Sequence, residues 1–385
     1  MAAAGERAGH PRRTFALGRS LVAAPLRATG ARGARDAGTH HPSRGVPVSA
    51  SRRLALALGV LGLALLVVAA LALFVGSAGL SPRAVARALA GQASADSVES
   101  VVTLQLRLPR VAAAALAGGA LAVAGVAFQG LTRNPLAEPS VLGVSSGAAF
   151  GVVLAQVFGL GLSALQALGV AVFAFAGALL AAGAVYLIAR MPGGLSVPTL
   201  LLAGVIVGIF FTSAITVLIS VVDFNRLGGV VHWLLGNLAP IPPGSLALFA
   251  LLALVGFGLI LRSARELNLL ALGEEAATQL GVDAARLKQR VFVAAALLTG
   301  TVVAFTGPIG FVGLVVPHML RGVLGQDNRL LVPAALVAGG VFLLAADTLA
   351  RNVVAPAELS VGVITSFCGA PLFVYLLRTR YRASL

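Results

Sequence analysis

Long apolar runs alternate with short polar segments along most of this chain. As a helix, an apolar run of about 17 to 25 residues can cross the hydrocarbon core of a bilayer. Ten such runs follow one another, at 54–76, 110–131, 140–160, 165–189, 198–222, 244–261, 291–307, 309–325, 330–350 and 360–378. The pattern therefore predicts an all-α membrane protein with ten transmembrane helices.

Two places in this pattern contain residues that interrupt a helix. The seventh and eighth spans meet at Thr306-Gly307-Pro308, and the third begins in the Gly- and Ser-containing stretch from Pro139 to Gly147. Irregular backbone at membrane depth is tolerated where it is buried in protein or lines a cavity. We therefore expect broken or partly unwound helices inside the bundle at both places.

One charged island, residues 262–290, separates the sixth and seventh spans. It contains Arg262, Arg265, Glu266, Glu274, Glu275, Asp283, Arg286, Lys288 and Arg290. The spacing of Leu269, Leu272, Ala276 and Leu280 predicts an apolar helical face that ends at Gly281. A helical loop in water between two spans is suited to contact a partner, and a solvated connector is the alternative interpretation.

The first fifty residues differ from the rest. They are rich in Arg, interrupted by Gly and Pro, and nearly free of acidic residues, so they cannot bury a core. We expect a disordered basic tail over 1–50 and a single transmembrane domain over 51–385. Arg52-Arg53 precedes the first apolar run as in a signal peptide, but that run is too long for a signal peptide and is interpreted as the first span.

Composition and charge agree with this class. Hydrophobic residues make up 58% of the chain and charged residues 11%, far below the share in a soluble domain. Of the 28 Lys and Arg residues, 22 lie in the tail, the C-terminus and the loops on one side of the predicted spans, which the positive-inside rule places in the cytoplasm. Both termini and the charged island are therefore predicted to be cytoplasmic. The basic residues are scattered over loops, so the net charge of +15 does not indicate nucleic-acid binding.

Signs of enzyme chemistry are missing from the sequence. Lys288 is the only lysine, and no Gly-rich loop ends in Lys-Ser/Thr, so the chain cannot cradle ATP itself. The five histidines show no metal-ligand spacing, and we expect neither a metal nor a cofactor. Asp347 stands four residues before Arg351, which suits a local ion pair, and a proton-coupling carboxylate is the alternative. With so few acids in the spans, energy is expected to come from outside the chain.

Several segments resemble one family, the FecCD-type permeases of ABC importers for iron–siderophore complexes, haem and cobalamin. They are RLPRVAAAALAGGALAVAGVAFQGLTRNPLAEPSVLGVSSGA (Arg107 to Ala148), LGEEAATQLGV (Leu272 to Val282), GPIGFVGLVVPHMLR (Gly307 to Arg321), LLAADTLAR (Leu343 to Arg351) and ELSVGVITSFCGAPLFVYLL (Glu358 to Leu377). The resemblance covers about residues 55–380. Leu359-Ser360 departs from the Leu-Pro that is usual in the family.

The resemblance implies a ten-helix ABC importer permease with an inverted internal repeat, in which helices two to five correspond to helices seven to ten. It implies a pathway between two permease subunits, which form a homodimer or a heterodimer, lined by the fifth and tenth helices and parts of the third and eighth. Leu116 to Gly125 and Leu297 to Gly307 echo each other weakly, as such a repeat requires.

Three functional surfaces follow from the resemblance. The loop that docks a dimer of cytoplasmic ATP-binding subunits corresponds to Leu272, Gly273, Glu274, Glu275, Ala276, Leu280 and Gly281. Arg107, Arg110 and Arg351 match arginines that receive acidic residues of an extracytoplasmic substrate-binding protein, and anchoring at the membrane interface is the alternative. We place the inner constriction of the pathway at Ser196, Val197, Pro198 and Thr199, with a simple loop as the alternative.

The sequence therefore predicts a multi-pass permease of the bacterial cytoplasmic membrane, surrounded by lipid, that imports an iron(III)–siderophore complex. Haem or cobalamin is an alternative cargo within the same family. A proton-coupled secondary transporter is the alternative from a different class, but it would need more carboxylates within the membrane. A membrane enzyme would need clustered catalytic side chains, which the sequence does not show.

Overall fold

Helices account for nearly all of the regular structure. The computed structural model describes residues 50–383 apart from 77, 160–168, 193 and 222–223, so the predicted tail lies outside the described residues. The helices are α1 (Ala50–Phe74), α2 (Pro82–Leu89), α3 (Val98–Ser100), the π-helix η1 (Val101–Arg107), α4 (Leu108–Thr132), the 3₁₀-helix η2 (Pro139–Leu142), α5 (Val144–Val157), α6 (Val170–Ala189), α7 (Val197–Ser220), α8 (Phe224–Leu234), α9 (Pro243–Leu270), α10 (Glu274–Gln279), α11 (Ala284–Thr306), α12 (Val312–Leu324), α13 (Asn328–Asn352) and α14 (Val361–Ala383).

Each of the ten predicted spans coincides with one of these helices. Seven of the described helical segments are long and apolar enough to cross a membrane: Ser51–Phe74, Val98–Thr132, Val170–Ala189, Val197–Ser220, Pro243–Leu270, Ala284–Thr306 and Asn328–Asn352. Three shorter apolar helices, Val144–Val157, Val312–Leu324 and Val361–Val374, match the remaining predicted spans. The all-α membrane fold is confirmed, whereas the count of ten spans stays a prediction.

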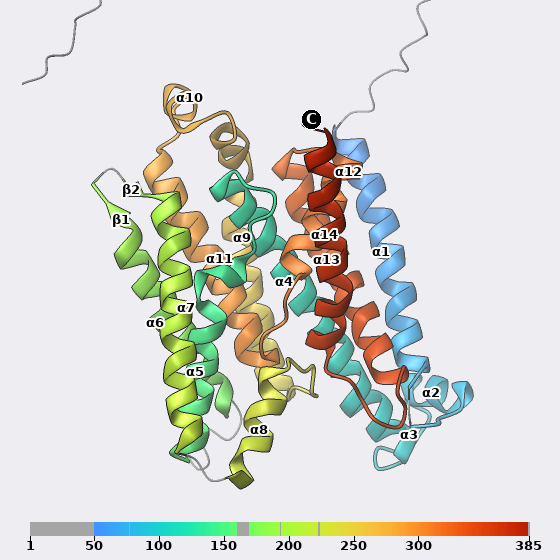
Figure 1. Ribbon diagram of the computed structural model, residues 1–385. Helices are drawn as coiled ribbons and strands as arrows, with labels where there is room; N and C mark the ends of the chain where they lie inside the picture. The colour runs from blue at the N-terminus through green and yellow to red at the C-terminus, as the bar shows by residue number, and fades with distance from the viewer. Residues whose placement is uncertain (1–49, 77, 160–168, 193, 222–223, 384–385) are drawn as a thin grey trace, which may run out of the picture. The chain divides into compact units, whose positions relative to one another are not determined.

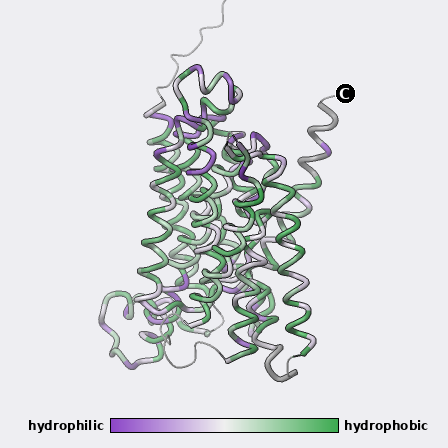
Figure 2. Tube along the Cα trace, turned by 90° about the vertical axis from the view of Figure 1, so that its left-hand side faces the viewer, coloured by the Kyte–Doolittle hydropathy of each residue, from purple (hydrophilic) through white to green (hydrophobic). Residues whose placement is uncertain are grey.

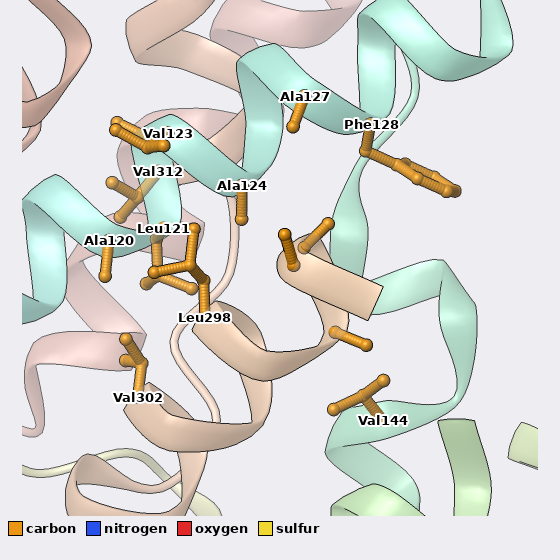
Figure 3. Packing of buried hydrophobic residues seen from close by; sticks show 14 of the residues in the cluster. Ala120, Leu121, Val123, Ala124, Ala127, Phe128, Val144, Leu298, Val302 and Val312 are labelled. Atoms are coloured by element: carbon orange, nitrogen blue, oxygen red, sulfur yellow. The ribbon is translucent and has the colours of Figure 1, made fainter. Parts of the chain in front are cut away.

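Helix α4 lies at the centre of the core. In its most apolar window 83% of the residues are buried, against 0% for α1. Figure 3 shows small side chains of α4, such as Ala120 and Ala124, packed against Leu298 and Val302 of α11. Small side chains allow helix backbones to approach closely, which is how membrane helices gain packing energy without a hydrophobic driving force.

Two pairs of facing glycines mark close crossings between helices. A methyl group on Gly118 of α4 would overlap the carbonyl oxygen of Gly339 in α13, and one on Gly339 would overlap that of Gly118. In the same way, a methyl group on Gly147 of α5 or on Gly177 of α6 would overlap the carbonyl oxygen of the other glycine. Only glycine fits at such a crossing, so these positions fix where α4 meets α13 and where α5 meets α6.

The two interruptions predicted from the sequence are present. Residues 139–142 form η2 and not α-helix, and α5 begins only at Val144. Helix α11 ends at Thr306, and α12 begins at Val312. The same order therefore occurs twice, a long helix followed by a break and a helix of 14 or 13 residues, as an internal repeat requires.

Polar groups gather at the two ends of the bundle. Figure 1 shows α10 and the strands β1 (Arg190–Met191) and β2 (Gly194–Leu195) at one end, with α2, α3 and α8 at the other. Figure 2 shows a largely apolar trace between these ends. We call them the α10 end and the α8 end. The sequence pattern did not predict the antiparallel hairpin, in which Arg190 pairs with Leu195.

Candidate functional site

The charged island is largely helical and is built from three helices. Helix α9 continues without a break to Leu270, α10 is a separate short helix, and α11 begins at Ala284 after the cap residue Asp283. The predicted face of Leu269, Leu272, Ala276 and Leu280 is therefore wrong as the face of one helix, because these residues are divided between two helices and the turns beside α10. The predicted break at Gly281 is confirmed by its φ of 86°.

The turns around α10 expose apolar side chains. Leu272 is 67% exposed and Leu280 is 58% exposed, whereas Ala277 on the inner side of α10 is fully buried. A cleft of about 820 Å³ runs beside them, lined by Glu274, Glu275, Thr278, Gln279, Gly281, Val282, Asp283, Ala284 and Ala285. We call Leu272, Leu280 and the residues that line this cleft the α10 surface.

Lys288 gives the α10 surface its support. Its side chain is 6% exposed, and its Nζ lies 2.8 Å from the Glu274 carboxylate. The buried Lys288 ammonium and the partly exposed Glu274 carboxylate therefore tie α10 to α11. The sequence pattern did not predict this pair. The single lysine near the apolar start of α11 could have indicated it, because a buried ammonium group needs an acidic partner.

The predicted inner constriction is the start of α7. Ser196 caps this helix, and its hydroxyl accepts hydrogen bonds from the Thr199 amide at 3.5 Å and from the Thr199 hydroxyl at 2.9 Å. Pro198 occupies the first helical turn, where its missing N–H costs nothing, so this segment is a helix start and not a simple loop. Gly194 in the preceding hairpin packs against Ala285 at the start of α11. The hairpin thus links the α10 surface to α7.

The three arginines at the α8 end are not free. Arg107 is 5% exposed, and its Nη1 donates to the Leu73 carbonyl at 2.6 Å. Arg351 is 4% exposed, and its Nη2 donates to the Ala72 carbonyl at 3.4 Å. Both guanidinium groups therefore satisfy carbonyl groups at the C-terminal end of α1, where cations are favoured.

Arg110 joins two acidic side chains. Two of its nitrogens donate to Oδ1 of Asp347, Nη2 at 2.9 Å and Nε at 3.1 Å. Its third nitrogen, Nη1, donates to the Glu358 carboxylate at 2.8 Å. The predicted pair of Asp347 and Arg351 is confirmed at 3.1 Å. The contacts of Arg110 were missed because they join residues more than 230 positions apart.

All three guanidinium groups border one cavity of about 300 Å³. Its lining is Gly76, Ala78, Val102, Leu106, Arg107, Arg110, Pro240, Arg351 and Glu358. The predicted set of arginines is thus brought together in space. We call these residues with Asp347 the arginine cluster.

Two further grooves lie on the helices expected to line the pathway. One, of about 380 Å³, carries the hydroxyls of Ser140, Ser146, Thr212 and Ser213 on η2, α5 and α7. The other, of about 720 Å³, lies along α14 beside the break before α12 and includes Gly362, Ser366 and Phe367. Both are shallow and contain no charged side chain, which suits a surface that a large solute passes without tight binding.

Glu138 is a carboxylate that the sequence analysis left unassigned. It accepts a hydrogen bond from the Phe311 amide at 2.7 Å and so joins the break before α5 to the break before α12. Among the residues that the structure describes, no group of three or more His, Cys, Asp and Glu side chains could hold a metal ion.

Comparison with known proteins decides the family. The model of the FecCD transport family matches residues 64–379. The chain belongs to the FecCD transport family. It is therefore the permease of an ABC importer.

Individual relatives differ in their cargo. The hemin transport system permease HmuU of Yersinia pestis is 41% identical over 327 residues, which cover 84% of this chain and 97% of the relative. The ferric enterobactin permease FepD of Escherichia coli is 38% identical and covers 87% of this chain and 99% of the relative. A solved ABC transporter of the metal-chelate type, in an inward-facing conformation, is 32% identical with a TM-score of 0.73 and covers 84% of this chain and 99% of its own.

Proposed function

We propose that this FecCD permease imports an iron(III)–siderophore complex across the bacterial cytoplasmic membrane. The family match carries this proposal, together with the relative that transports ferric enterobactin. The uncharged grooves on α7 and α14 support it, because a bulky chelate needs a path that does not hold it. Two permease copies, or one copy and a similar permease, would enclose that path between them.

ATP hydrolysis belongs to a separate subunit that docks on the α10 surface. The sequence has no phosphate-binding loop, and the exposed Leu272 and Leu280 offer a partner an apolar contact. A dimer of ATP-binding subunits would press on α10, and the Lys288–Glu274 pair would carry the movement into α11. The α10 end and both termini would then face the cytoplasm.

An extracytoplasmic binding protein docks at the α8 end. Because Arg107 and Arg351 are buried, docking relies on the mouth of the cavity and on the arginine cluster as a whole, with acidic side chains of the binding protein as its partners. This interpretation replaces the simpler picture of three arginines standing free at the surface.

Haem or cobalamin is the second candidate cargo. The hemin permease is as similar to this chain as the other relatives, and a cobalamin permease of Halobacterium salinarum is 42% identical over 73% of this chain and 74% of the relative. Uptake of labelled ferric siderophore, haem and cobalamin would separate these cargoes.

The decisive experiment is uptake in proteoliposomes that hold the permease, its ATPase and its binding protein. We expect labelled ferric siderophore to accumulate when ATP reaches the ATPase side, and a proton ionophore to leave this accumulation unchanged. Glu275→Arg should abolish uptake and ATPase co-purification, because Glu275 is exposed on α10 and a reversed charge there faces the ATPase. Asp96→Arg, a reversed exposed charge at the α8 end, is the matched control and should retain ATPase binding.

A pH gradient that drives uptake without ATP would contradict the proposed energy source. Unimpaired ATPase binding in Glu275→Arg would contradict the docking surface.

A further inference from the structure

We propose that Glu358 occupies Arg110 as an internal ligand, and that an acidic side chain of the binding protein takes its place on docking. The exchange would release the segment that leads into α14. This inference rests on the proposed docking at the α8 end and adds how that docking is sensed.

The two carboxylates on Arg110 differ in how firmly they are held. Asp347 is fully buried, contacts Arg110 through two nitrogens and also pairs with Arg351. The Glu358 side chain is 42% exposed and contacts Arg110 through a single hydrogen bond of 2.8 Å. Water competes for the partly exposed Glu358 carboxylate, which weakens its hold on Arg110, whereas breaking the buried contacts of Asp347 is costly. Glu358 is therefore the carboxylate that can be exchanged.

The arginine cluster carries a net positive charge. It holds three guanidinium groups and only two carboxylates, Asp347 and Glu358. The Nη1 of Arg107 donates to a backbone carbonyl and not to an acid. The Nε of Arg351 is buried without a well-oriented acceptor, although Asp347 lies 3.1 Å away. An additional carboxylate would neutralise this excess.

The cavity provides the room that an incoming carboxylate needs. Its volume of about 300 Å³ is bordered by all three guanidinium groups and by Glu358 itself. A water molecule takes up roughly 30 Å³ in the liquid, so a carboxylate and several waters fit together. Planar guanidinium groups bind carboxylates in pairs of hydrogen bonds, which favours an acidic side chain as the ligand.

Glu358 is placed where its release would reach the pathway. It lies three residues before α14, and the adjacent Leu359 amide holds the segment to the Ala350 carbonyl at 3.1 Å. Gly362, in the first turn of α14, packs against the Leu235 carbonyl and lines the groove of about 720 Å³. Loss of the Arg110 contact would leave that segment with fewer anchors and let the start of α14 shift along the groove.

The test uses the permease–ATPase complex in phosphatidylcholine nanodiscs, titrated with the cognate binding protein loaded with ferric siderophore. Glu358→Gln keeps the size and a hydrogen-bond acceptor but removes the competing charge. We expect it to tighten docking about two- to five-fold, the range that an exposed ion pair gives. Hydrogen exchange of residues 353–362 should rise on docking in the wild type, and it should already be raised in undocked Glu358→Gln.

Glu99→Gln is the matched control. Glu99 forms an ion pair with Arg87 at 3.7 Å in the α2–α3 region, which also lies at the α8 end, so its loss tests a general charge effect. This control should change neither the docking affinity nor the exchange of residues 353–362. An equal gain in affinity in both variants would overturn the exchange model.

The remaining outcomes separate the inference from the docking that it rests on. Docking that depends on salt in the wild type but is unchanged in Glu358→Gln, with no rise in exchange, would overturn the inference and leave the docking surface standing. Docking that fails or does not respond to salt in the wild type would overturn both. If phosphatidylglycerol in the nanodisc raises the exchange and the binding protein does not, the cluster takes a lipid phosphate and the inference is wrong.

Discussion

Asp347 lies between two arginines with no exposure to solvent. Arg351 reaches it from one turn along α13, and Arg110 reaches it from the start of α4. Burying charges costs desolvation energy, which is repaid only when each charge is paired in good geometry. With two cations in contact, Asp347 is held as a structural counter-ion and is a poor candidate for carrying a proton.

Replacing Asp347 by Asn should therefore act through stability. Removing one partner of a buried pair costs about 3–5 kcal/mol because it leaves the other charge without its partner. Here Arg351 would lose its carboxylate partner, whereas Arg110 would keep its contact with Glu358. We expect a clear fall in the thermal unfolding temperature of the purified permease, while the uptake that remains per folded molecule stays insensitive to a proton ionophore.

Asp96→Asn is the control for this substitution, since Asp96 is exposed near the α8 end, and it should leave the unfolding temperature unchanged. An Asp347→Asn permease of normal stability that has lost all transport would point instead to a proton-carrying role.

At the scale of elements, close helix crossings and polar ties between helix ends hold the bundle together. The crossings of α4 with α13 and of α5 with α6 depend on facing glycines. The ends of α9 and α13 are tied by Asn268, whose Nδ2 donates to Asp327 at 2.7 Å and whose Oδ1 accepts from the Asn328 amide at 2.8 Å. Neither kind of contact depends on the hydrophobic effect, which is weak between helices in lipid.

Gly118→Ala should destabilise the permease even though alanine favours helix. The added methyl group meets the Gly339 backbone, which cannot move aside as a flexible side chain could, and overpacking of this kind costs about 1–3 kcal/mol. Gly183→Ala on α6 is the matched control, because nothing lies within 4 Å of the added atom. It should be neutral or raise stability by about 0.5–1 kcal/mol. Thermal unfolding in detergent compares the two, and equal stability of both variants would mean that α4 and α13 do not meet at this point.

The contact between Asn268 of α9 and Asp327, which caps α13, should depend on pH. Hydrogen bonds from Arg329 lower the pKa of Asp327 from 3.8 to about 2. Burial acts in the opposite direction, and the hydrogen bond from the Asn268 amide lowers the pKa further. A carboxyl group with a lowered pKa stabilises the folded state above its unfolded pKa, and that contribution is lost as the pH falls through about 2. The stabilisation is therefore complete at neutral pH.

Asp327→Ala should lower stability by about 1 kcal/mol at neutral pH, the usual cost of losing a helix cap. The difference from the wild type should shrink as the pH falls from about 4 towards about 2, where the wild-type carboxylate becomes protonated. Unfolding measured along this pH series checks it. A difference that stays constant with pH would show that the cap acts without its charge.

At the scale of the whole molecule, the sequence predicted the helices well and their contacts poorly. Apolar length alone located the ten helical segments, and Gly-Pro and Gly-Ser stretches located both interruptions, because these are local properties of the chain. The pairs of Arg110 with Glu358 and of Lys288 with Glu274 join residues that are distant in the sequence or belong to different helices, and hydropathy carries no information about which segments meet.

For the candidate surfaces, the sequence predicted which residues lie together but not how these residues are buried or divided between helices. The three arginines do border one cavity, but the burial of Arg107 and Arg351 depends on their contacts with the end of α1, which no local pattern shows. The prediction of one apolar face on the charged island was wrong because α9 extends to Leu270 and α10 is a separate helix from Glu274. The periodicity of a single helix does not hold across the non-helical residues between them.

The contacts of α1 have a consequence for the way the chain is made. This helix emerges early from the ribosome, and none of its most apolar window is buried by the rest of the bundle. The side chains that hold its end come from Arg107, which is 34 residues after Leu73, and from Arg351, which is 279 residues after Ala72. During synthesis α1 must therefore stay in the bilayer by its own hydrophobicity while most of the protein is still untranslated. The contact between its end and Arg351 forms only after α13 has been synthesised.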